Sequence, residues 1–146
     1  MAVEKNKELV RRFFNEALDR NDVGLLDDMF DENCVFYRGD LDEPVQGLGG
    51  VRAIVEKRAL LYRDFESEIH SVIGEGDLVA SGQTHTGVHR GEFPTPIGTF
   101  NVKDRPIEWS SQVFFRFEGD KISEVRVARD ELALLRYLDI KLEAQH

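Results

Sequence analysis

Apolar residues in the first part of the chain recur at the spacing of an α-helix. Over residues 6–20 they fall three or four positions apart with charged residues between them, which predicts an amphipathic helix with one buried stripe. Asn21-Asp22 then offers a stop and a new N-cap, and a short second helix is predicted over residues 25–30. A third helical pattern covers residues 51–61.

After residue 61 the period changes from helical to alternating, which is typical of strands. Two tight-turn signals, Gly74–Asp77 and Glu118–Asp120, join neighbouring segments as antiparallel pairs. A final helical pattern covers Glu131–Leu138. The predicted strands are Cys34–Tyr37, Phe65–Ile73, Leu78–Val88, Ile107–Phe117 and Ile122–Ala128.

Helices followed by antiparallel strands predict an α+β fold, with the helices packed on one face of a curved sheet. A bent sheet wrapped around helices tends to leave a cone-shaped hollow, and ligands usually bind in such hollows. The segments Gly39–Gly50 and Gly91–Arg105 are predicted as loops, and the second is long enough to cover the mouth of a cavity. No linker or internal repeat interrupts the sequence, so we expect one domain over residues 1–146.

Charge and composition narrow the classes of partner. With 28 acidic and 19 basic residues the formal net charge is −9, and no basic stripe offsets it, so we expect no nucleic-acid partner. No apolar run approaches the roughly 20 residues that a membrane span needs, and the N-terminus is too polar for a signal peptide. Cys34 is the only cysteine, so a disulfide within the chain is impossible and the reducing cytoplasm is the expected location.

The best candidate for proton chemistry is Asp130, where the last strand meets the last predicted helix. Because side chains alternate along a strand, Arg126, Ala128 and Asp130 are expected to share one face. If that face lines the hollow, Asp130 is placed to move a proton. The alternative is an N-cap, in which Asp130 accepts the free N–H groups of the helix that follows. One carboxylate does not easily serve both roles, and both interpretations stay open.

His85 and His89 lie four residues apart on one predicted strand and face the same side. At roughly 3.3 Å per residue their Cα atoms are about 13 Å apart. One Zn²⁺ ion cannot bridge that distance without a bend in the strand, so we expect no metal site here. In the hollow, His85 would be a proton partner or hydrogen-bond donor, and the alternative is an ordinary half-buried histidine. For His89 the simpler interpretation is a surface residue.

Alternation does not decide which face of the 107–117 strand turns inward. One face carries Trp109 and Ser111, and the other carries Gln112. In the hollow, Gln112 would donate a hydrogen bond to a carbonyl group; on the outer face it suits a dimer interface. Aromatic residues of the helices and first strand form the core or line the hollow. The candidate substrate contacts are Arg126, Gln112, Trp109, Phe36, Tyr37 and Phe14.

Two further features have plain structural explanations. Gly47-Leu-Gly-Gly50 lacks the preceding strand and the spacing of a dinucleotide-binding fingerprint, and a loop leading into a helix accounts for it. Cys34 has no sequence signature of a base partner and is expected to be a small buried residue.

Six segments, in order along nearly the whole chain, resemble SnoaL-like proteins, the polyketide-cyclase branch of the NTF2-like superfamily that also contains ketosteroid isomerases. The resemblance implies a cone-shaped α+β barrel, usually a homodimer through the outer face of the sheet, with an apolar pocket for a small molecule and no metal or organic cofactor. It implies less about activity, because this fold hosts cyclases, isomerases, hydrolases, dehydratases and non-catalytic modules. The segments are Asn6–Phe14, Asp22–Asp27, Gly50–Arg52, Gly87–Phe93, Phe115–Glu124 and Asp130–Arg136.

In the cyclases of this family an aspartate just before the last helix is the acid/base, and Asp130 matches that position. Arg126 departs from the family, which often has Trp or another bulky residue there. A nearby guanidinium group would favour the ionised carboxylate of Asp130 and make it a weaker base. It could instead bind an anionic group or stabilise an enolate.

The leading hypothesis is therefore a small enzyme of the cyclase or isomerase type that acts on an apolar, enolisable carbonyl compound, with Asp130 and His85 as its candidate acid/base residues. The first rival is a non-catalytic ligand-binding or dimerising module on the same scaffold. A hydrolase or dehydratase ranks last. Limonene-type epoxide hydrolases need an Asp-Arg-Asp arrangement, which Arg126 and Asp130 supply only in part.

Overall fold

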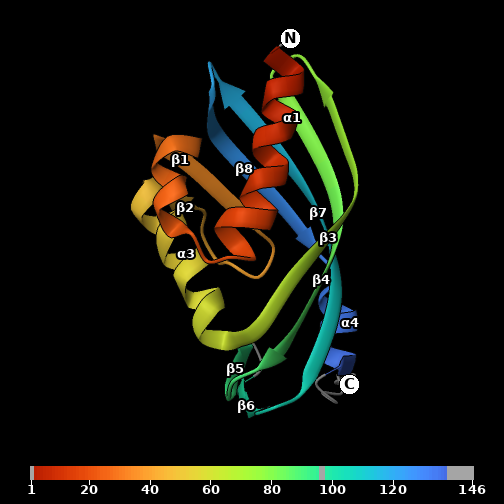
Figure 1. Ribbon diagram of the computed structural model, residues 1–146. Coiled ribbons are helices and arrows are strands. Elements are labelled where there is room, and N and C mark those ends of the chain that lie inside the picture. The colour runs from red at the N-terminus through yellow and green to blue at the C-terminus, as the bar shows by residue number, and fades with distance from the viewer. Residues whose placement is uncertain (1, 96–97, 138–146) are drawn as a thin grey trace, which may run out of the picture.

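The computed structural model of the protein describes residues 2–95 and 98–137, and places its N-terminal helices against one face of a curved sheet (Figure 1). The helical segments are α1 (Ala2–Arg12), η1 (Phe13–Leu18), η2 (Val23–Leu25), α2 (Leu26–Met29), α3 (Gly47–Leu61) and α4 (Glu131–Tyr137). The strands are β1 (Phe30–Arg38), β2 (Val45–Gln46), β3 (Tyr62–Glu75), β4 (Leu78–His89), β5 (Glu92–Thr95), β6 (Gly98–Asn101), β7 (Pro106–Glu118) and β8 (Lys121–Arg129). This order confirms the predicted α+β class.

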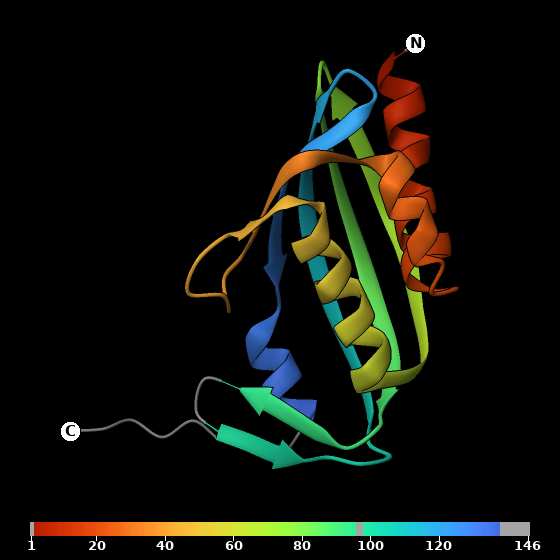
Figure 2. The ribbon, with the colours of Figure 1, turned by 90° about the vertical axis from the view of Figure 1, so that its left-hand side faces the viewer.

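The main sheet has six strands in the order β2-β1-β8-β7-β4-β3. All neighbours are antiparallel except β1 and β8, which run parallel, with Phe36 opposite Val125. The strands β5 and β6 form a separate hairpin. Seen from the side, α3 and α1 lie along the inner face of the sheet and the hairpin lies at one end (Figure 2). Among the described residues, no helix is both long and apolar enough to cross a membrane.

Aromatic residues pack the helical segment η1 against the sheet. Phe13 and Phe14 are both buried, and the ring of Phe13 meets those of Phe14, Phe30 and Phe115 edge-on at centroid distances of 5.2, 5.5 and 5.7 Å. Such T-shaped pairs add stability beyond the apolar area that they bury. These contacts connect η1 to strands β1 and β7, and so fix one wall of the space between helices and sheet.

Several predicted boundaries differ from the structure. The first predicted helix, over residues 6–20, is α1 followed by the π-helical turn η1. Phe30, placed in the second predicted helix, has extended backbone angles and begins β1, which is longer than the predicted strand. The predicted loop Gly91–Arg105 contains the β5–β6 hairpin. The last residue of the predicted final helix, Leu138, lies outside the described residues.

On β7 and β8, side chains alternate between the two faces of the sheet, and one set on each strand points into the interior. On β7 the buried side chains are every second one from Ile107 to Phe117, a set that includes Trp109 and Ser111. On β8, Val125 and Val127 point inward, and so does Arg129. The neighbouring set, Arg126, Ala128 and Asp130, is exposed. The condition under which Asp130 would be placed to move a proton, that this face lines the hollow, is therefore not met.

His89 ends β4 at the base of the hairpin and is fully buried, so the surface interpretation is wrong. Its ring packs on Tyr62 and Phe93 at centroid distances of 4.6 and 4.9 Å. Neither ring nitrogen has a hydrogen-bond partner among the described residues. Burial, helped by the charge of Arg105, lowers the pKa of His89 to about 4, so the neutral ring is a source of pH-dependent stability.

We predict that the free energy of unfolding falls as the pH is lowered from about 6.5 to about 4. In that window the unfolded chain binds protons at histidines that the folded state keeps neutral, so acid favours unfolding. His89→Phe keeps an aromatic ring beside Tyr62 and Phe93 and removes two unpaired nitrogens. It should raise the free energy of unfolding at pH 7 by roughly 1–2 kcal/mol and weaken the pH dependence. Urea denaturation at pH 7 and pH 5, followed by circular dichroism, measures both effects.

His70→Gln is the matched control, because His70 lies exposed on β3, and it should change the free energy of unfolding at pH 7 by less than about 0.5 kcal/mol. An unchanged pH dependence in His89→Phe would contradict the role assigned to His89.

Candidate functional site

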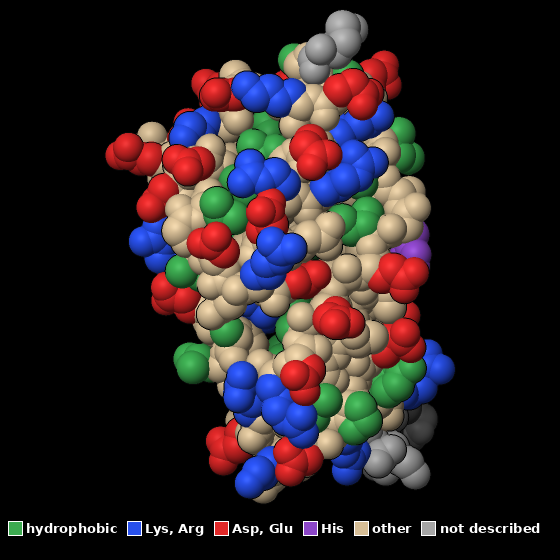
Figure 3. Space-filling view, in the orientation of Figure 1, with side chains coloured by type: hydrophobic (Ala, Val, Ile, Leu, Met, Phe, Trp, Pro, Cys, Tyr) green, Lys and Arg blue, Asp and Glu red, His purple; other side chains and the backbone are tan. Residues whose placement is uncertain are grey.

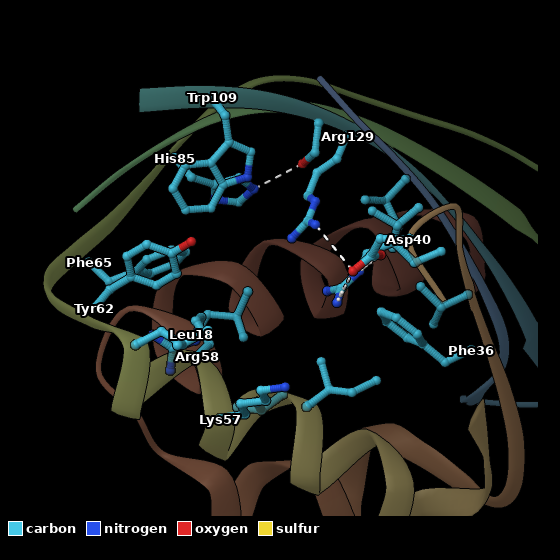
Figure 4. A pocket seen from close by; sticks show the side chains of 18 of the residues that line it. Leu18, Phe36, Asp40, Lys57, Arg58, Tyr62, Phe65, His85, Trp109 and Arg129 are labelled. Atoms are coloured by element: carbon cyan, nitrogen blue, oxygen red, sulfur yellow. Dashed lines mark hydrogen bonds and ion pairs between the residues drawn. The ribbon is translucent and has the colours of Figure 1, made fainter. Parts of the chain in front are cut away.

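A pocket of about 250 Å³ lies between the inner face of the sheet and the segments η1 and α3, with the β5–β6 hairpin at one end (Figure 4). Its volume is just below the roughly 300–1,000 Å³ of typical ligand pockets, which suits a molecule of one or two rings. The lining is mostly apolar, and η1, α3 and β7 each contribute to it. Representative apolar lining residues are Phe14, Leu18, Ile54, Val55, Trp109 and Val113.

His85 projects from β4 into one wall of the pocket and is only 5% exposed. Its ring stacks on Phe65 at 5.4 Å and contacts Trp109 at 5.3 Å and Phe14 at 5.9 Å. Burial, followed by the positive charges of Arg129 and Arg58, lowers the pKa of His85 to about 4. The imidazole is therefore neutral near pH 7.

Both nitrogens of His85 are hydrogen-bonded to serine hydroxyl groups. Nδ1 lies 2.9 Å from Oγ of Ser67, and Nε2 lies 2.9 Å from Oγ of Ser111. Ser67 in turn bonds to Asp19, and Ser111 to Gln83. Of these groups only Ser111 and His85 line the pocket. A neutral histidine with both nitrogens occupied is held in one orientation.

Arg129 reaches the pocket from the end of β8, and its guanidinium group points into the space between sheet and α3 (Figure 4). It is 15% exposed and lies between two carboxylates. Nε bonds to Glu131 at 2.8 Å, and Nη2 lies 3.3 Å from Oδ2 of Asp40. Nη1 has no hydrogen bond to any residue in the described ranges, which leaves a cationic donor for a ligand.

Asp40 is the carboxylate that lines the pocket. Burial alone would raise its pKa, but hydrogen bonds from Arg38 and the charges of Arg129 and Arg38 hold the pKa below the ordinary value. Burial alone would lower the pKa of Arg129, but its bonds to Glu131 and the charge of Asp40 raise it. The charges of Asp40 and Arg129 therefore persist near pH 7.

Tyr62 adds a neutral donor. Its hydroxyl group points into the pocket (Figure 4) and has no hydrogen-bond partner within the described part of the chain. Burial raises the pKa of Tyr62 to about 12, although the charges of Arg129 and Arg38 oppose the rise. The hydroxyl thus stays protonated over the physiological pH range.

The α3 wall carries two more cations, Lys57 and Arg58. The guanidinium carbon of Arg58 lies 4.6 Å from the centre of the Phe65 ring, which is cation–π distance. Four cationic side chains and one carboxylate line this pocket, whereas acidic and basic side chains are interspersed over the face of the molecule seen in Figure 3. The pocket of this acidic protein is thus positive, and it favours a ligand that carries or develops negative charge.

Asp130 does not enter the pocket. It is exposed, and its Oδ1 accepts a hydrogen bond of 3.0 Å from the backbone N–H of Ala133. This is the N-cap alternative. The physical reason is the alternation on β8, which turns Arg129 inward and its neighbour outward. The expectation that Asp130 lies in the hollow is wrong, and with it goes the reason for assigning proton transfer to this residue.

Of the other candidate site residues, some line the pocket and some lie outside it. His85, Trp109, Phe36 and Phe14 line the pocket. The remaining three do not, and the expectation that they contact a ligand there is wrong. Gln112 is exposed on the outer face, and Arg126 lies over the Tyr37 ring at 4.0 Å, away from the pocket.

Sequence reasoning missed Arg129, Asp40, Tyr62 and Ser67. For Arg129 a signal was present, since the apolar residues Val125 and Val127 share its parity along the strand. Asp40 lies in a predicted loop and Ser67 depends on a contact with Asp19, 48 residues away. Among the residues that the structure describes, no group of three or more His, Cys, Asp or Glu is arranged to hold a metal ion.

Comparison with known proteins identifies a matching family and solved structures with a similar fold. The sequence matches the SnoaL-like polyketide cyclase family over residues 8–138. No curated protein matches it significantly. Among solved structures, AclR from Streptomyces galilaeus superposes with a TM-score of 0.80 at 23% identity, covering 94% of this chain and 97% of AclR.

Two further structures are similar. A SnoaL-like polyketide cyclase from Agrobacterium tumefaciens has a TM-score of 0.76 at 20% identity, covering 91% of this chain and 97% of its own. An LEH-like epoxide hydrolase from M. tuberculosis has a TM-score of 0.72 at 16% identity, covering 93% and 86%. At these identities the structural similarities establish the fold alone.

We predict that an apolar aromatic probe binds beside Trp109, the only tryptophan, and quenches its fluorescence. 2-Naphthol is such a probe. Val127→Phe fills part of the pocket and should weaken its binding at least about tenfold, or about 1.4 kcal/mol. Ala128→Phe places the same ring on the opposite face of β8 and should leave binding unchanged. Equal weakening by the two variants would contradict the assignment of faces on β8.

Proposed function

The chain belongs to the SnoaL-like polyketide cyclase family, and from that premise we propose that it catalyses proton transfer, of the cyclase or isomerase type, on a small apolar compound with an enolisable carbonyl group. The observation that carries the proposal is the pairing inside one apolar pocket of a neutral imidazole, His85, with a guanidinium group, Arg129, and a protonated hydroxyl, Tyr62. Base and oxyanion donors are the two requirements for removing a proton next to a carbonyl.

In the proposed reaction the substrate carbonyl oxygen lies against Nη1 of Arg129 and the hydroxyl of Tyr62. The C–H bond next to the carbonyl breaks, its electrons move onto the carbonyl oxygen, and the proton passes through the hydroxyl group of Ser111 to Nε2 of His85. The enolate is stabilised by the positive charge of Arg129. Returning the proton to another carbon completes an isomerisation. Alternatively, the enolate carbon attacks a second carbonyl in the same molecule, and the new alkoxide takes the proton, which completes a cyclisation.

Because the pKa of His85 is low, the groups that stabilise the enolate must supply much of the rate acceleration. A base whose pKa is about 4 is weak, but the Asp base of ketosteroid isomerase works at about 4.6 because strong oxyanion donors accompany it. Here the corresponding donors are Arg129 and Tyr62. Removing one oxyanion donor typically slows a reaction by roughly 10²–10³-fold, so these two residues should matter as much as the base.

A hydrolase is the second candidate, because Arg129 lies between the carboxylates of Asp40 and Glu131 in an acid–Arg–acid arrangement. Opening an epoxide needs one carboxyl group to donate a proton. The lowered pKa of Asp40 makes it a poor donor, and Glu131 is not part of the pocket lining. Proton transfer is therefore better supported.

The partner proposed beyond the small molecule is a second copy of the chain, paired through the outer face of the sheet. One row across this face consists of Ile73, Ala80, Phe114 and Arg126, and Phe114 is 50% exposed. Ala80 lies on one side of Phe114 in this row and Arg126 on the other. The buried free thiol of Cys34 suits the cytoplasm, which we propose as the location.

We predict that the protein accelerates hydrogen–deuterium exchange at the carbon next to the carbonyl of 2-tetralone, a bicyclic ketone probe, followed in D₂O by proton NMR. His85→Gln should slow this exchange by roughly 10²-fold or more. Arg129→Met should slow it by a similar factor, while Arg38 still pairs with Asp40.

Asp130→Asn is the control, because the amide keeps the helix cap outside the pocket. Exchange by Asp130→Asn should equal that of the wild type. If the wild type binds 2-naphthol but exchanges no ketone proton, the proton-transfer proposal fails and a ligand-binding module is the better account.

A separate prediction concerns assembly. Phe114→Glu places a charge in the middle of the proposed sheet interface and should convert a dimer into a monomer, measured by native mass spectrometry. Leu60→Glu changes an even more exposed apolar residue on α3, away from this face, and should leave the mass unchanged. A wild-type protein that is monomeric at micromolar concentration would refute the proposed dimer.

A further inference from the structure

A continuous chain of hydrogen bonds joins the protein surface to the pocket. Asp19 lines a surface groove on one side of η1 together with Asn15, Arg20 and Asp64. Its Oδ1 lies 2.8 Å from Oγ of Ser67, which lies 2.9 Å from Nδ1 of His85. On the other side of the ring, Nε2 lies 2.9 Å from Oγ of Ser111 in the pocket wall. Four polar groups thus cross an otherwise aromatic layer.

We propose that this chain is a proton relay: Asp19 and Ser67 fix the tautomer of His85, and they carry the substrate's proton between Ser111 in the pocket and solvent at Asp19. The inference rests on the proposed function, since a relay needs a reaction to serve. Asp19 and Ser67 are positioning residues in this account. Neither touches the substrate.

The direction of the bonds at the pocket end follows from Gln83. Its Nε2 lies 3.0 Å from the carbonyl oxygen of Ser111, which can only accept, so the amide nitrogen must face that side. The same nitrogen lies 2.7 Å from Oγ of Ser111 and donates to it. The hydroxyl proton of Ser111 is then free to point at Nε2 of His85. This assigns Nε2 as an acceptor without a proton.

The direction at the surface end follows from Asp19. One carboxylate oxygen accepts the backbone N–H of Ser67 at 3.0 Å, and the other accepts its hydroxyl proton at 2.8 Å. An ionised carboxylate has no proton to give, so the Ser67 hydroxyl must accept from its other neighbour. That neighbour is Nδ1 of His85. Both ends therefore specify the same form of the ring, with the proton on Nδ1.

The chain removes the difficulty of a weak base. As the substrate's C–H bond breaks, its proton bonds to Oγ of Ser111 and the Ser111 proton moves to Nε2 of His85. The Nδ1 proton moves to Ser67 and the Ser67 proton to Asp19. Each group gains one proton and loses one, except Asp19, which ends neutral while the substrate becomes the enolate. His85 is never charged inside the aromatic layer.

Asp19 is suited to the end of such a chain. Burial raises its pKa, although its bonds to Ser67 and the charge of Arg58 oppose the rise. A carboxylate with a raised pKa holds a relayed proton better than an ordinary exposed one. Because Asp19 is only partly buried and borders the groove, that proton can exchange with water.

The test reads the tautomer of His85 directly by ¹⁵N NMR of histidine-labelled protein near pH 7, with the His85 signals identified by their loss in His85→Gln. We expect the wild type to carry its proton on Nδ1. Asp19→Asn keeps the shape of the side chain but supplies an N–H donor toward Ser67, so part of the population should shift to the Nε2 tautomer. Ser67→Ala should give a mixture of both.

Two serine variants serve as controls. Ser67→Thr keeps the hydroxyl and should keep the wild-type tautomer. Ser81 lies on the same strand as His85, and its buried hydroxyl has no partner among the described residues. Ser81→Ala should therefore leave the tautomer of His85 unchanged. A wild-type ring with its proton on Nε2, or an unchanged tautomer in both Ser67→Ala and Asp19→Asn, would overturn the relay.

The effect on catalysis is measured separately, as the rate of hydrogen–deuterium exchange in 2-tetralone. Ser67→Ala should slow its hydrogen–deuterium exchange at least about tenfold without weakening 2-naphthol binding, and Ser67→Thr should restore the rate. If Ser67→Ala exchanges as fast as the wild type, the relay is wrong and the proposed proton transfer stands. If the wild type itself exchanges no proton, both fall, and the NMR result reports only the direction of the hydrogen bonds.

Discussion

This site depends on one constraint: polar groups that are buried among aromatic rings need hydrogen-bonding or charged partners. A buried polar group without a partner destabilises the folded protein. His85 meets this constraint with two serine hydroxyls, and Arg129 meets it with Asp40 and Glu131. His89, which has no such partner in the described ranges, stays neutral and gains only ring contacts. Satisfying the first two groups fixes their orientation, and that orientation gives the pocket its chemistry.

The fold supplies these groups from different elements and brings them to one space. Strand β4 carries the imidazole, β8 carries the guanidinium, and β3 begins with the tyrosine. Because all three strands belong to one curved sheet, their inward side chains converge where α3 and η1 cover it. The result is a positive pocket in an acidic protein, which stabilises negative charge on a bound molecule and keeps its apolar body away from water.

The sequence predicted the fold better than the site. Periodicity identified the α+β class and most strands, because burial of one face imposes alternation over long segments such as Leu78–Val88. His85 and Trp109 were among the candidate residues and both line the pocket, although alternation did not decide which face of the 107–117 strand turns inward. Alternation alone did not decide whether Asp130 enters the hollow or caps the last helix, although the apolar Val125 and Val127 marked the inner face. The bond between Asp19 and Ser67 joins residues 48 apart, and no local pattern encodes it.

The most direct test of the central claim is a crystal structure of the protein with 2-naphthol, whose oxygen stands in for that of an enolate. This oxygen should lie within hydrogen-bonding distance of Nη1 of Arg129 or the hydroxyl of Tyr62, with the ring carbon next to it facing Ser111. A naphthol whose oxygen contacts neither group, or a molecule bound outside the pocket, would contradict the claim.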